Sequence, residues 1–521
     1  MKRRSMLLFL MIFLTTTMLA PVSFAEPLNE ISLYLNGKKL PAEVAPYIDP
    51  EAEVTMVPLR VISESLGAEV KWTQHSRTVD IYREDSHISM SVDNHYARVD
   101  GRLVELEASV QLYQNTTMVP VRFIAEELGI QVFWNQSTRS VLMWTKDQAD
   151  TGADAEMRGA WISTVYNLDW PSASSYGNAS EQQQQFEKLL DDLLVMGLNT
   201  VFVQVRPSGD ALYPSTLVPW SKYLTGTQGQ DPGYDPLAFM IEAAHERGME
   251  FHAWFNPFRA NTDNKREGLA PQHVVNTHPE WIVEADKKLF INPGIPEARQ
   301  HIISAIMEVV TRYDIDGVHL DDYFYPSNVA FPDDTSYSSY NPNGLDRASW
   351  RRSNINDFVQ QLGVSIKEAK PQVEFGVSPF GVWRNHNVDP TGSATRAGVS
   401  TYDHMFADVR TWVQQEWIDY VMPQLYWSMS FEVARYDKLV DWWVQEVAGT
   451  NVDLYIGHSP YKIGTKESGW HTAQEIINQL EYNKQYPQIK GDVFFSAKDL
   501  RRNPLGIVEL LRGYYVESGV E

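Results

Sequence analysis

Two consecutive aspartates at the end of a strand-like segment are the residues best suited to chemistry in this sequence. Asp321 and Asp322 follow the run Gly-Val-His-Leu that begins at Gly317. Cleavage of a glycosidic bond needs one group that protonates the leaving oxygen and another that acts as nucleophile or base, most often two carboxyl groups. Asp321 fits either role. Its partner is left open between Asp322, which is adjacent, and Asp210 and Asp169, which lie on neighbouring loops.

Further polar and aromatic residues occupy corresponding positions near the ends of other strand-like segments. Amides, hydroxyls and charged groups orient a ligand, and aromatic rings supply flat apolar surfaces on which sugar rings stack. We expect eleven residues to bind substrate: Trp161, Gln204, Arg206, Asp210, His252, Asn256, His319, Tyr323, Gln424, Tyr426 and Trp427.

The elements that must position these residues are repeated pairs of a strand and a helix. From residue 158 onward, short β-branched or aromatic runs alternate with longer helical patterns, which is typical of parallel βα units. We expect eight strands, at 159–165, 200–206, 250–256, 317–323, 374–380, 418–426, 453–459 and 492–498. Eight such units predict a (β/α)8 TIM barrel over 158–518, with the active site at the C-terminal ends of the strands. An open doubly wound sheet is disfavoured because no Gly-rich phosphate turn follows a strand.

Strand alternation sorts the candidate side chains within such a barrel. It points His319, Asp321 and Tyr323 toward the barrel axis and Asp322 away from it, as an orienting residue unless the strand breaks there. Buried polar groups cost free energy unless they are paired, so their convergence on one mouth predicts a site. The alternative is a buried ion pair between Arg206 and Asp321 that only stabilises the barrel.

An internal repeat precedes the barrel. Residues 56–72 recur as 118–134, an offset of 62 residues, and about half of the aligned positions are identical. Each unit reads as a strand, a short helix ending at a glycine, and a second strand. The two units predict a small α+β domain over 31–145, and 146–157, rich in Asp, Ala and Gly, reads as a linker.

The N-terminal sequence and the composition restrict location and partners. Three basic residues, an apolar run and the sequence Ser-Phe-Ala ending at Ala25 form a secretory signal, so 1–25 is expected to be removed. We therefore expect a secreted protein, extracellular or associated with the cell wall, with no membrane span after cleavage. The absence of cysteine excludes a thiolate nucleophile and a disulfide. A formal net charge of −23 argues against nucleic acid as a partner.

Three blocks of the barrel, 159–171, 199–211 and 316–326, resemble the glycosyl hydrolase-like family 10. This resemblance implies a TIM-barrel carbohydrate-active enzyme exported to the cell envelope, with some relatives acting on peptidoglycan glycan strands. The strand-four acids of the family pattern match Asp321 and Asp322, and its strand-two positions match Arg206 and Asp210.

The repeat region resembles the copper amine oxidase-like N-terminal module, a stalk domain of secreted bacterial proteins. Its name does not imply copper, because His75, His87 and His95 lack the spacing of metal ligands. A spacer role or contact with the cell wall is the expected function of this domain.

The sequence therefore predicts a glycoside hydrolase that acts on an envelope polysaccharide, foremost peptidoglycan glycan, without a cofactor or metal. Substrate-assisted cleavage of a 2-acetamido sugar ranks second as a mechanism, with Tyr323 and Tyr426 holding the amide. Tyr323 stands where the chitinase-type pattern requires an acid. Two other functions remain alternatives: a non-catalytic wall-binding protein, and a metal-dependent deacetylase that uses His319 and Asp321 as ligands, although no His-x-x-x-His motif follows.

Overall fold

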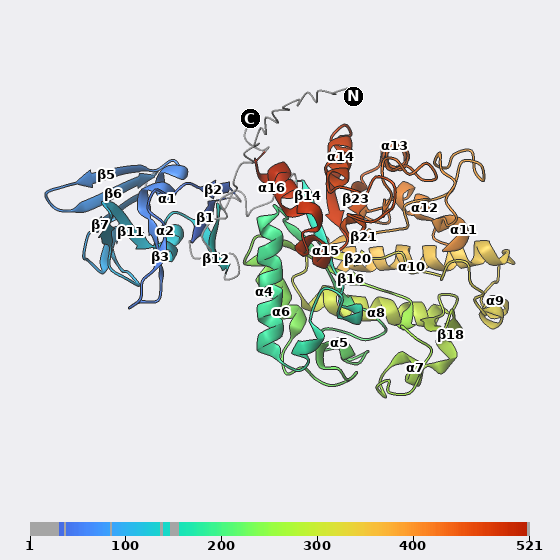
Figure 1. The fold of residues 1–521 in the computed structure, drawn as a ribbon. Coiled ribbons are helices and arrows are strands. Elements are labelled where there is room, and N and C mark those ends of the chain that lie inside the picture. The colour runs from blue at the N-terminus through green and yellow to red at the C-terminus, as the bar shows by residue number, and fades with distance from the viewer. Residues whose placement is uncertain (1–30, 36–37, 84–85, 136–138, 146–155, 518–521) are drawn as a thin grey trace, which may run out of the picture.

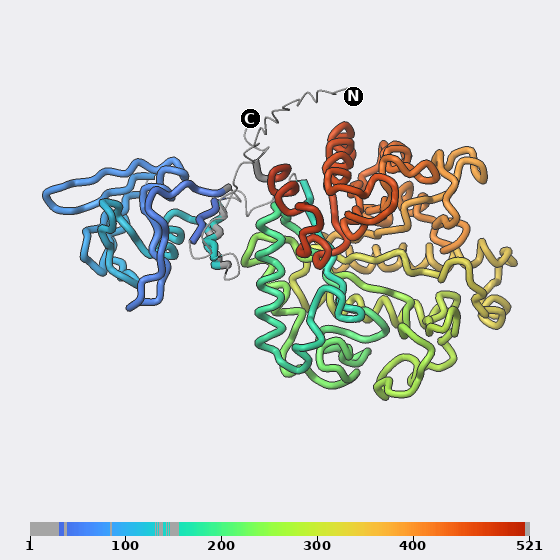
Figure 2. The backbone as a smooth tube through the Cα atoms, in the orientation of Figure 1, coloured from blue at the N-terminus to red at the C-terminus, as the bar shows by residue number. Residues whose placement is uncertain are grey.

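The computed structural model describes residues 31–35, 38–83, 86–135, 139–145 and 156–517. A small sheet-rich unit precedes a barrel surrounded by helices (Figure 1). The chain completes the first unit before it enters the barrel, as the colours of the trace show (Figure 2). The expected signal peptide and residues 146–155 of the expected linker lie outside the described residues. Among the helices that are described, none is both long and apolar enough to span a membrane.

Eight parallel strands close into the barrel, which confirms the predicted TIM-barrel fold. In barrel order they are β14 (Met157–Ile162), β15 (Thr200–Arg206), β16 (Glu250–Phe255), β20 (Gly317–Leu320), β21 (Glu374–Val377), β22 (Tyr420–Val421), β23 (Asp453–His458) and β24 (Ile489–Phe494). Longer helices in this region include α4 (Ala179–Val195), α6 (Pro236–His245), α8 (Pro296–Arg312), α10 (Arg347–Ala369), α13 (Tyr436–Val447) and α14 (Gln474–Asn483).

Several strands are shorter than the sequence predicts, and β20 shows why. Its ladder ends at Leu320, so residues 321–323 belong to a loop and no longer alternate as a strand does. Asp321 instead accepts a hydrogen bond from the backbone N–H of Tyr323. At the other end of the barrel, β14 already begins at Met157, within the segment expected to be linker.

The outer helices form because their apolar residues recur at helical spacing. In α4, Phe186, Leu189, Leu190 and Leu193 are buried on one face. Asn178 caps this helix, since its side-chain oxygen accepts a backbone hydrogen bond from the first turn. Burying each large apolar side chain contributes roughly 1.5–3 kcal/mol, so these helices hold the barrel closed.

The barrel interior is filled by aromatic rings, among them Trp161, Phe202, Trp254 and Tyr420. The Tyr420 hydroxyl lies 3.0 Å from Nδ1 of His319 and 3.1 Å from Nδ1 of His252. The Tyr420 hydroxyl is therefore paired inside the barrel, and the packed rings form a floor beneath its mouth.

The N-terminal unit has the two strand–helix–strand repeats that the sequence predicts. The first comprises β4 (Thr55–Pro58), α1 (Leu59–Ser65) and β5 (Glu69–Thr73), and the second comprises β11 (Thr116–Pro120), α2 (Val121–Glu127) and β12 (Ile130–Asn135). Gly67 and Gly129 follow the helices with φ of 75° and 70°, a conformation that glycine adopts without strain. The other strands are β1 (Ser32–Leu35), β2 (Lys38–Leu40), β3 (Tyr47–Ile48), β6 (Thr78–Arg83), β7 (Ser86–Ser91), β8 (Tyr96–Val99), β9 (Arg102–Glu105), β10 (Gln111–Tyr113) and β13 (Ser140–Thr145).

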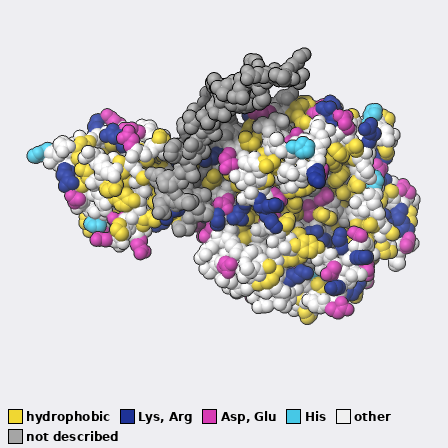
Figure 3. Space-filling view, in the orientation of Figure 1, with side chains coloured by type: hydrophobic (Ala, Val, Ile, Leu, Met, Phe, Trp, Pro, Cys, Tyr) yellow, Lys and Arg dark blue, Asp and Glu magenta, His cyan; other side chains and the backbone are white. Residues whose placement is uncertain are grey.

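Acidic and basic side chains are interspersed over the face of the molecule drawn in Figure 3. A nucleic-acid-binding protein concentrates Lys and Arg on one face, as a continuous basic patch. The mixed distribution on this face, like the net charge of −23, does not resemble such a patch.

Candidate active site

A cavity of about 240 Å³ lies at the C-terminal mouth of the barrel. Its wall carries two carboxyl groups, one guanidinium group, two side-chain amides and five aromatic rings, contributed by Asp321, Asp322, Arg259, Gln204, Gln424, Trp161, Trp254, Tyr323, Tyr426 and Phe495. These residues come from the ends of, or the segments just after, six of the eight strands, so the cavity lies where TIM-barrel enzymes carry out their chemistry.

Asp321 is a buried carboxylate held by three donors. Its Oδ2 accepts hydrogen bonds from Nε1 of Trp254 at 3.0 Å and Nδ2 of Asn256 at 2.9 Å, and its Oδ1 accepts one from the backbone of Tyr323 at 3.1 Å. Burial raises the pKa of Asp321, while the nearby Arg259 guanidinium and these donors oppose the rise. The donors fix the carboxylate in one orientation at the cavity wall.

Asp322 is the group best placed to carry a proton. Its Oδ1 accepts a hydrogen bond of 3.1 Å from Nε2 of Gln424, which also donates to the carbonyl oxygen of Ser378. Desolvation at the base of the cavity and the charge of Asp321 raise the pKa of Asp322 to about 7. The site therefore pairs a carboxylic acid that is protonated near neutral pH with a fixed carboxylate.

The strand ends before Asp322, which is the exception attached to its expected outward orientation. Alternation would point its side chain away from Asp321, but β20 ends at Leu320, and both carboxyl groups line the cavity. Asp210 and Asp169, the other proposed partners, lie elsewhere. Asp210 is buried and accepts hydrogen bonds from Ser208 and Gln228, and Asp169 joins the loop after β14 to the segment after β24.

The ion pair between Arg206 and Asp321, which the alternative reading requires, does not form. Arg206 is fully buried and donates to the carbonyl oxygens of Asn256 and Pro257. The cation beside Asp321 is Arg259. The alternative in which the polar convergence only stabilises the barrel therefore lacks the contact on which it depends.

Of the eleven residues expected to bind substrate, five line the cavity: Trp161, Gln204, Tyr323, Gln424 and Tyr426. The other six, Arg206, Asp210, His252, Asn256, His319 and Trp427, are not part of its wall. His252 and His319 are buried within strands, as part of the packed floor. Arg206, Asp210 and Asn256 lie at or beyond strand ends and are buried against backbone or neighbouring side chains. Trp427 packs edge-on against Phe380. We therefore no longer expect His319 and Asn256 to contact the substrate. Each instead hydrogen-bonds to a residue of the cavity wall, His319 to Trp161 and Asn256 to Asp321.

His319 shows how this support works. Its Nε2 lies 3.0 Å from Nε1 of Trp161 and 3.0 Å from the hydroxyl of Ser378. Burial lowers the pKa of His319 well below its ordinary value, so the ring is neutral and fixes the indole of Trp161 at the cavity wall. Within 31–517, leaving out the undescribed segments, no three His, Asp or Glu side chains form a group that could hold a metal ion. The deacetylase alternative thus finds no ligand set there.

Three of the ten cavity residues named above, Trp254, Arg259 and Phe495, are not among the residues expected from the sequence. Trp254 is two residues from both His252 and Asn256, so alternation places it on the same face of the strand and could have identified it. Arg259 lies in β17 (Arg259–Asn261), three residues beyond Asn256, where alternation along β16 no longer applies. Its guanidinium lies 5.1 Å from the ring centre of Tyr323, and its Nε donates to the carbonyl oxygen of Pro207.

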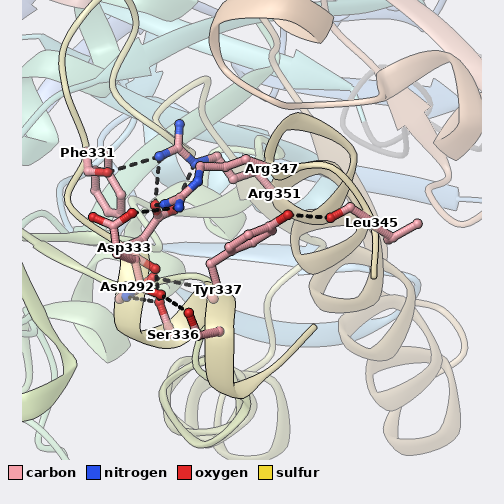
Figure 4. Close-up of polar contacts among 11 residues, drawn as sticks. Asn292, Phe331, Asp333, Ser336, Tyr337, Leu345, Arg347 and Arg351 are labelled. Atoms are coloured by element: carbon pink, nitrogen blue, oxygen red, sulfur yellow. Dashed lines mark hydrogen bonds and ion pairs between the residues drawn. The ribbon is translucent and has the colours of Figure 1, made fainter. Parts of the chain in front are cut away.

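The loop that carries the two aspartates is fastened to α10 by a buried acidic residue (Figure 4). The Asp333 carboxylate accepts hydrogen bonds from Nε and Nη2 of Arg351, both at 2.8 Å, and from Nη1 of Arg347 at 2.6 Å. Nδ2 of Asn292, just after β19 (Lys288–Ile291), donates to the hydroxyl of Ser336 in α9 (Asp334–Ser339), the helix that begins after Asp333. These contacts restrain the C-terminal end of the segment that follows Asp322.

Replacement of Asp333 by Ala is expected to lower the free energy of unfolding by about 3–5 kcal/mol, because it leaves the buried end of Arg351 without its anion. Urea denaturation followed by circular dichroism measures this loss. Asp334 is the matched control, since it is 82% exposed and pairs only with Arg347. Its replacement by Ala should cost less than about 1 kcal/mol, and equal losses for the two variants would contradict the anchoring role of Asp333.

Comparison with known proteins agrees with this architecture. Residues 156–472 match the family "Glycosyl hydrolase-like 10", and residues 34–143 match "Copper amine oxidase N-terminal domain". The chain is 50% identical over 371 residues to the glycosyl hydrolase YngK of Bacillus subtilis, which covers 70% of this chain and 72% of that protein. It is 44% identical over 369 residues to the glycosyl hydrolase DigH of Escherichia coli K12, covering 66% of this chain and 84% of DigH.

Among solved structures, the PgaB (BpsB) glycoside hydrolase domain of Bordetella bronchiseptica aligns with a TM-score of 0.45 at 12% identity, covering 69% of this chain and 98% of that one. The two family matches confirm both resemblances found in the sequence. The chain therefore belongs to the glycosyl hydrolase-like 10 family and is an enzyme of the glycoside hydrolase class.

Proposed function

We propose that the protein hydrolyses a polysaccharide of the cell envelope, the glycan strands of peptidoglycan, and that Asp321 and Asp322 carry out the reaction. The observation that supports this most directly is the placement of two carboxyl groups in one cavity, one oriented by three hydrogen-bond donors and the other with a raised pKa. Asp322 has a pKa raised to about 7, and Asp321 is held beside Arg259 by three donors. Such a division between acid and carboxylate is what glycosidic cleavage requires.

In the proposed reaction, the Asp322 carboxyl transfers its proton to the glycosidic oxygen as the bond from that oxygen to the anomeric carbon breaks. The fixed negative charge of Asp321 stabilises the positive charge that develops on the sugar ring. Water adds to the anomeric carbon and its proton returns to Asp322. The net change is the addition of one water across one glycosidic bond.

Two tyrosines at the cavity wall favour a 2-acetamido sugar as the ring that is cleaved. The charge of Asp322 and burial raise the pKa of Tyr323 to about 12, and burial raises the pKa of Tyr426 well above its ordinary value. Both hydroxyls therefore stay protonated and can donate to an acetamide oxygen. This supports substrate-assisted cleavage as the second candidate mechanism, in which the acetamido group supplies the nucleophile.

The size of the cavity and the N-terminal sequence support a polymeric substrate outside the cell. Pockets that enclose drug-sized ligands measure about 300 Å³ or more, whereas this one measures about 240 Å³. It suits one sugar ring of a longer chain. The secretory pattern of 1–25 would bring the enzyme to the cell wall, and we propose a secreted or wall-associated location.

Incubation of the enzyme with intact peptidoglycan, peptide-stripped peptidoglycan and β-mannan tests this proposal, with soluble saccharides identified by mass spectrometry. We expect release from peptide-stripped glycan and none from mannan. Release from mannan alone would assign a different substrate. Retention of the protein on peptidoglycan without any release would favour the non-catalytic wall-binding alternative.

A further inference from the structure

The N-terminal unit has two large surface grooves that play no part in the site at the barrel mouth. One, the Trp72 groove, has a volume of about 730 Å³ and includes Arg60, Val70 and Trp72 in its wall. The other, the Trp134 groove, has a volume of about 650 Å³ and includes Arg122, Val132 and Trp134. Both exceed the catalytic cavity in volume.

A local two-fold axis relates the two repeats. Strands β4 and β11 pair antiparallel, with Val57 opposite Val119, Met56 opposite Pro120 and Pro58 opposite Met118. The sequence offset of 62 makes Val57 and Val119 equivalent residues. An antiparallel pair in which equivalent residues face each other has a two-fold axis between them, so each structural feature of one repeat should recur in the other.

The grooves are such a recurring feature. Each lies between the helix and following strands of one repeat and the hairpin of the other, at 112–117 for the Trp72 groove and at 50–55 for the Trp134 groove. Arg60, Val70 and Trp72 of one groove correspond to Arg122, Val132 and Trp134 of the other. The same three residue types thus stand in both grooves, although about half of the repeat differs in sequence.

The residues in the walls of the two grooves indicate which kind of ligand they could bind. Both indoles are half-buried, with one part packed against the core and another in the groove wall, where a flat apolar ring can stack on a sugar ring. The arginines are paired with carboxylates: Arg60 with Glu64 at 2.8 Å and Arg122 with Glu107 at 3.2 Å. Paired charges attract no anionic polymer, but they can hydrogen-bond to hydroxyl and amide groups.

We propose that the Trp72 and Trp134 grooves bind sugar rings of the polysaccharide that the barrel cleaves, as two equivalent subsites of an anchoring domain. Two equivalent grooves match a ligand whose structure repeats, and the barrel of the same chain belongs to a glycoside hydrolase family. The identity of the polymer rests on the function proposed above. Because insoluble peptidoglycan presents many glycan strands, both grooves can be occupied at once, and their joint affinity should greatly exceed that of either alone.

Pelleting of the full chain with insoluble peptide-stripped peptidoglycan tests the proposal. Trp72→Ala and Trp134→Ala should each weaken retention by about tenfold, a loss of about 1.4 kcal/mol per site. The double variant should weaken retention further than either single variant. Tyr96→Ala is the matched control, because Tyr96 is an exposed aromatic residue, 45% accessible, of the same unit and lies outside both grooves. It should pellet like the wild type.

Folding and catalysis are measured on the same variants. Trp→Phe replacements keep a ring in each groove and should retain most binding, and thermal unfolding identifies any variant that does not fold. Hydrolysis of a short soluble glycan fragment should be unchanged by all of them. A folded double alanine variant that pellets like the wild type would overturn the proposal, and so would a wild type that never pellets. Loss of pelleting in a protein that releases no saccharide would support the grooves and reject the catalytic proposal.

Discussion

Replacing Asp321 by Asn is expected to lower kcat by about 1,000-fold or more, because the site loses the fixed negative charge that faces the developing positive charge of the sugar ring. The Asn side chain has nearly the same shape as that of Asp, but it carries an NH2 group where Asp carries an oxygen. Donors from Trp254, Asn256 and Tyr323 converge on the two oxygens of Asp321, so the amide NH2 of Asn must face at least one of them. Steady-state rates of saccharide release measure the loss.

The controls for Asp321→Asn separate chemistry from folding. Asp334→Asn removes an exposed aspartate at the start of α9, just after this loop, and should keep the wild-type rate. Circular dichroism and thermal unfolding should show that Asp321→Asn is folded, with some loss of stability because at least one donor then faces the amide NH2 instead of an oxygen. A folded Asp321→Asn protein with more than one tenth of the wild-type rate would remove Asp321 from the reaction.

Replacing Asp322 by Asn produces a second large loss, about 100-fold to 10,000-fold, because the amide has no proton to transfer to the leaving oxygen. In the wild type, the requirement for the Asp322 proton should appear as a dependence of the rate on pH. With a pKa of about 7, Asp322 is protonated below that pH and ionised above it. The wild-type kcat/KM should therefore fall about tenfold per unit above pH 7, and the residual activity of Asp322→Asn should lack that limb.

The same substitution should increase stability at alkaline pH. The folded chain holds the Asp322 proton up to about pH 7, whereas the unfolded chain releases it near pH 4. Wild-type stability from this group is therefore lost as pH rises from about 4 to 7. Asn carries no charge that must be buried, so Asp322→Asn should unfold at a higher temperature than the wild type at pH 8. This difference should shrink at pH 5, and an equal difference at both pH values would contradict the raised pKa.

Much of the barrel could be predicted from sequence because its signal is periodic and redundant. All eight strands were expected near their observed positions, and the start of β15 at Thr200 and of β20 at Gly317 agree with the prediction. Asp321 was found because it follows a buried strand at the end where TIM-barrel sites lie. The repeat was equally clear, since its strands and helices recur at a fixed offset.

The ends of the strands were less predictable, and the errors in the site follow from this. Alternation holds only while the ladder continues, so it fails for Asp322, which lies two residues beyond Leu320, the last residue of β20. It also cannot tell how deep a side chain lies. His252 and His319 face inward as alternation suggests, but they lie below the cavity rather than in its wall.

Arg259 could not be found by alternation at all, because its position depends on the three-stranded sheet inserted after β16, in which β17 pairs with β19 (Lys288–Ile291) and β18 (Ile282–Ala285) completes the order. A cation beside two carboxyl groups is a tertiary feature. It is formed by chain segments that are not related by any regular spacing in the sequence.

The central claim is that the barrel hydrolyses glycan strands with Asp321 and Asp322. The most direct test is incubation of the wild type, Asp321→Asn and Asp322→Asn with peptide-stripped peptidoglycan in water enriched in ¹⁸O, followed by mass spectrometry. We predict that the wild type releases saccharides whose new reducing ends each carry one ¹⁸O, and that neither variant does so at a comparable rate. Products without ¹⁸O, or equal release by the wild type and both variants, would contradict the account.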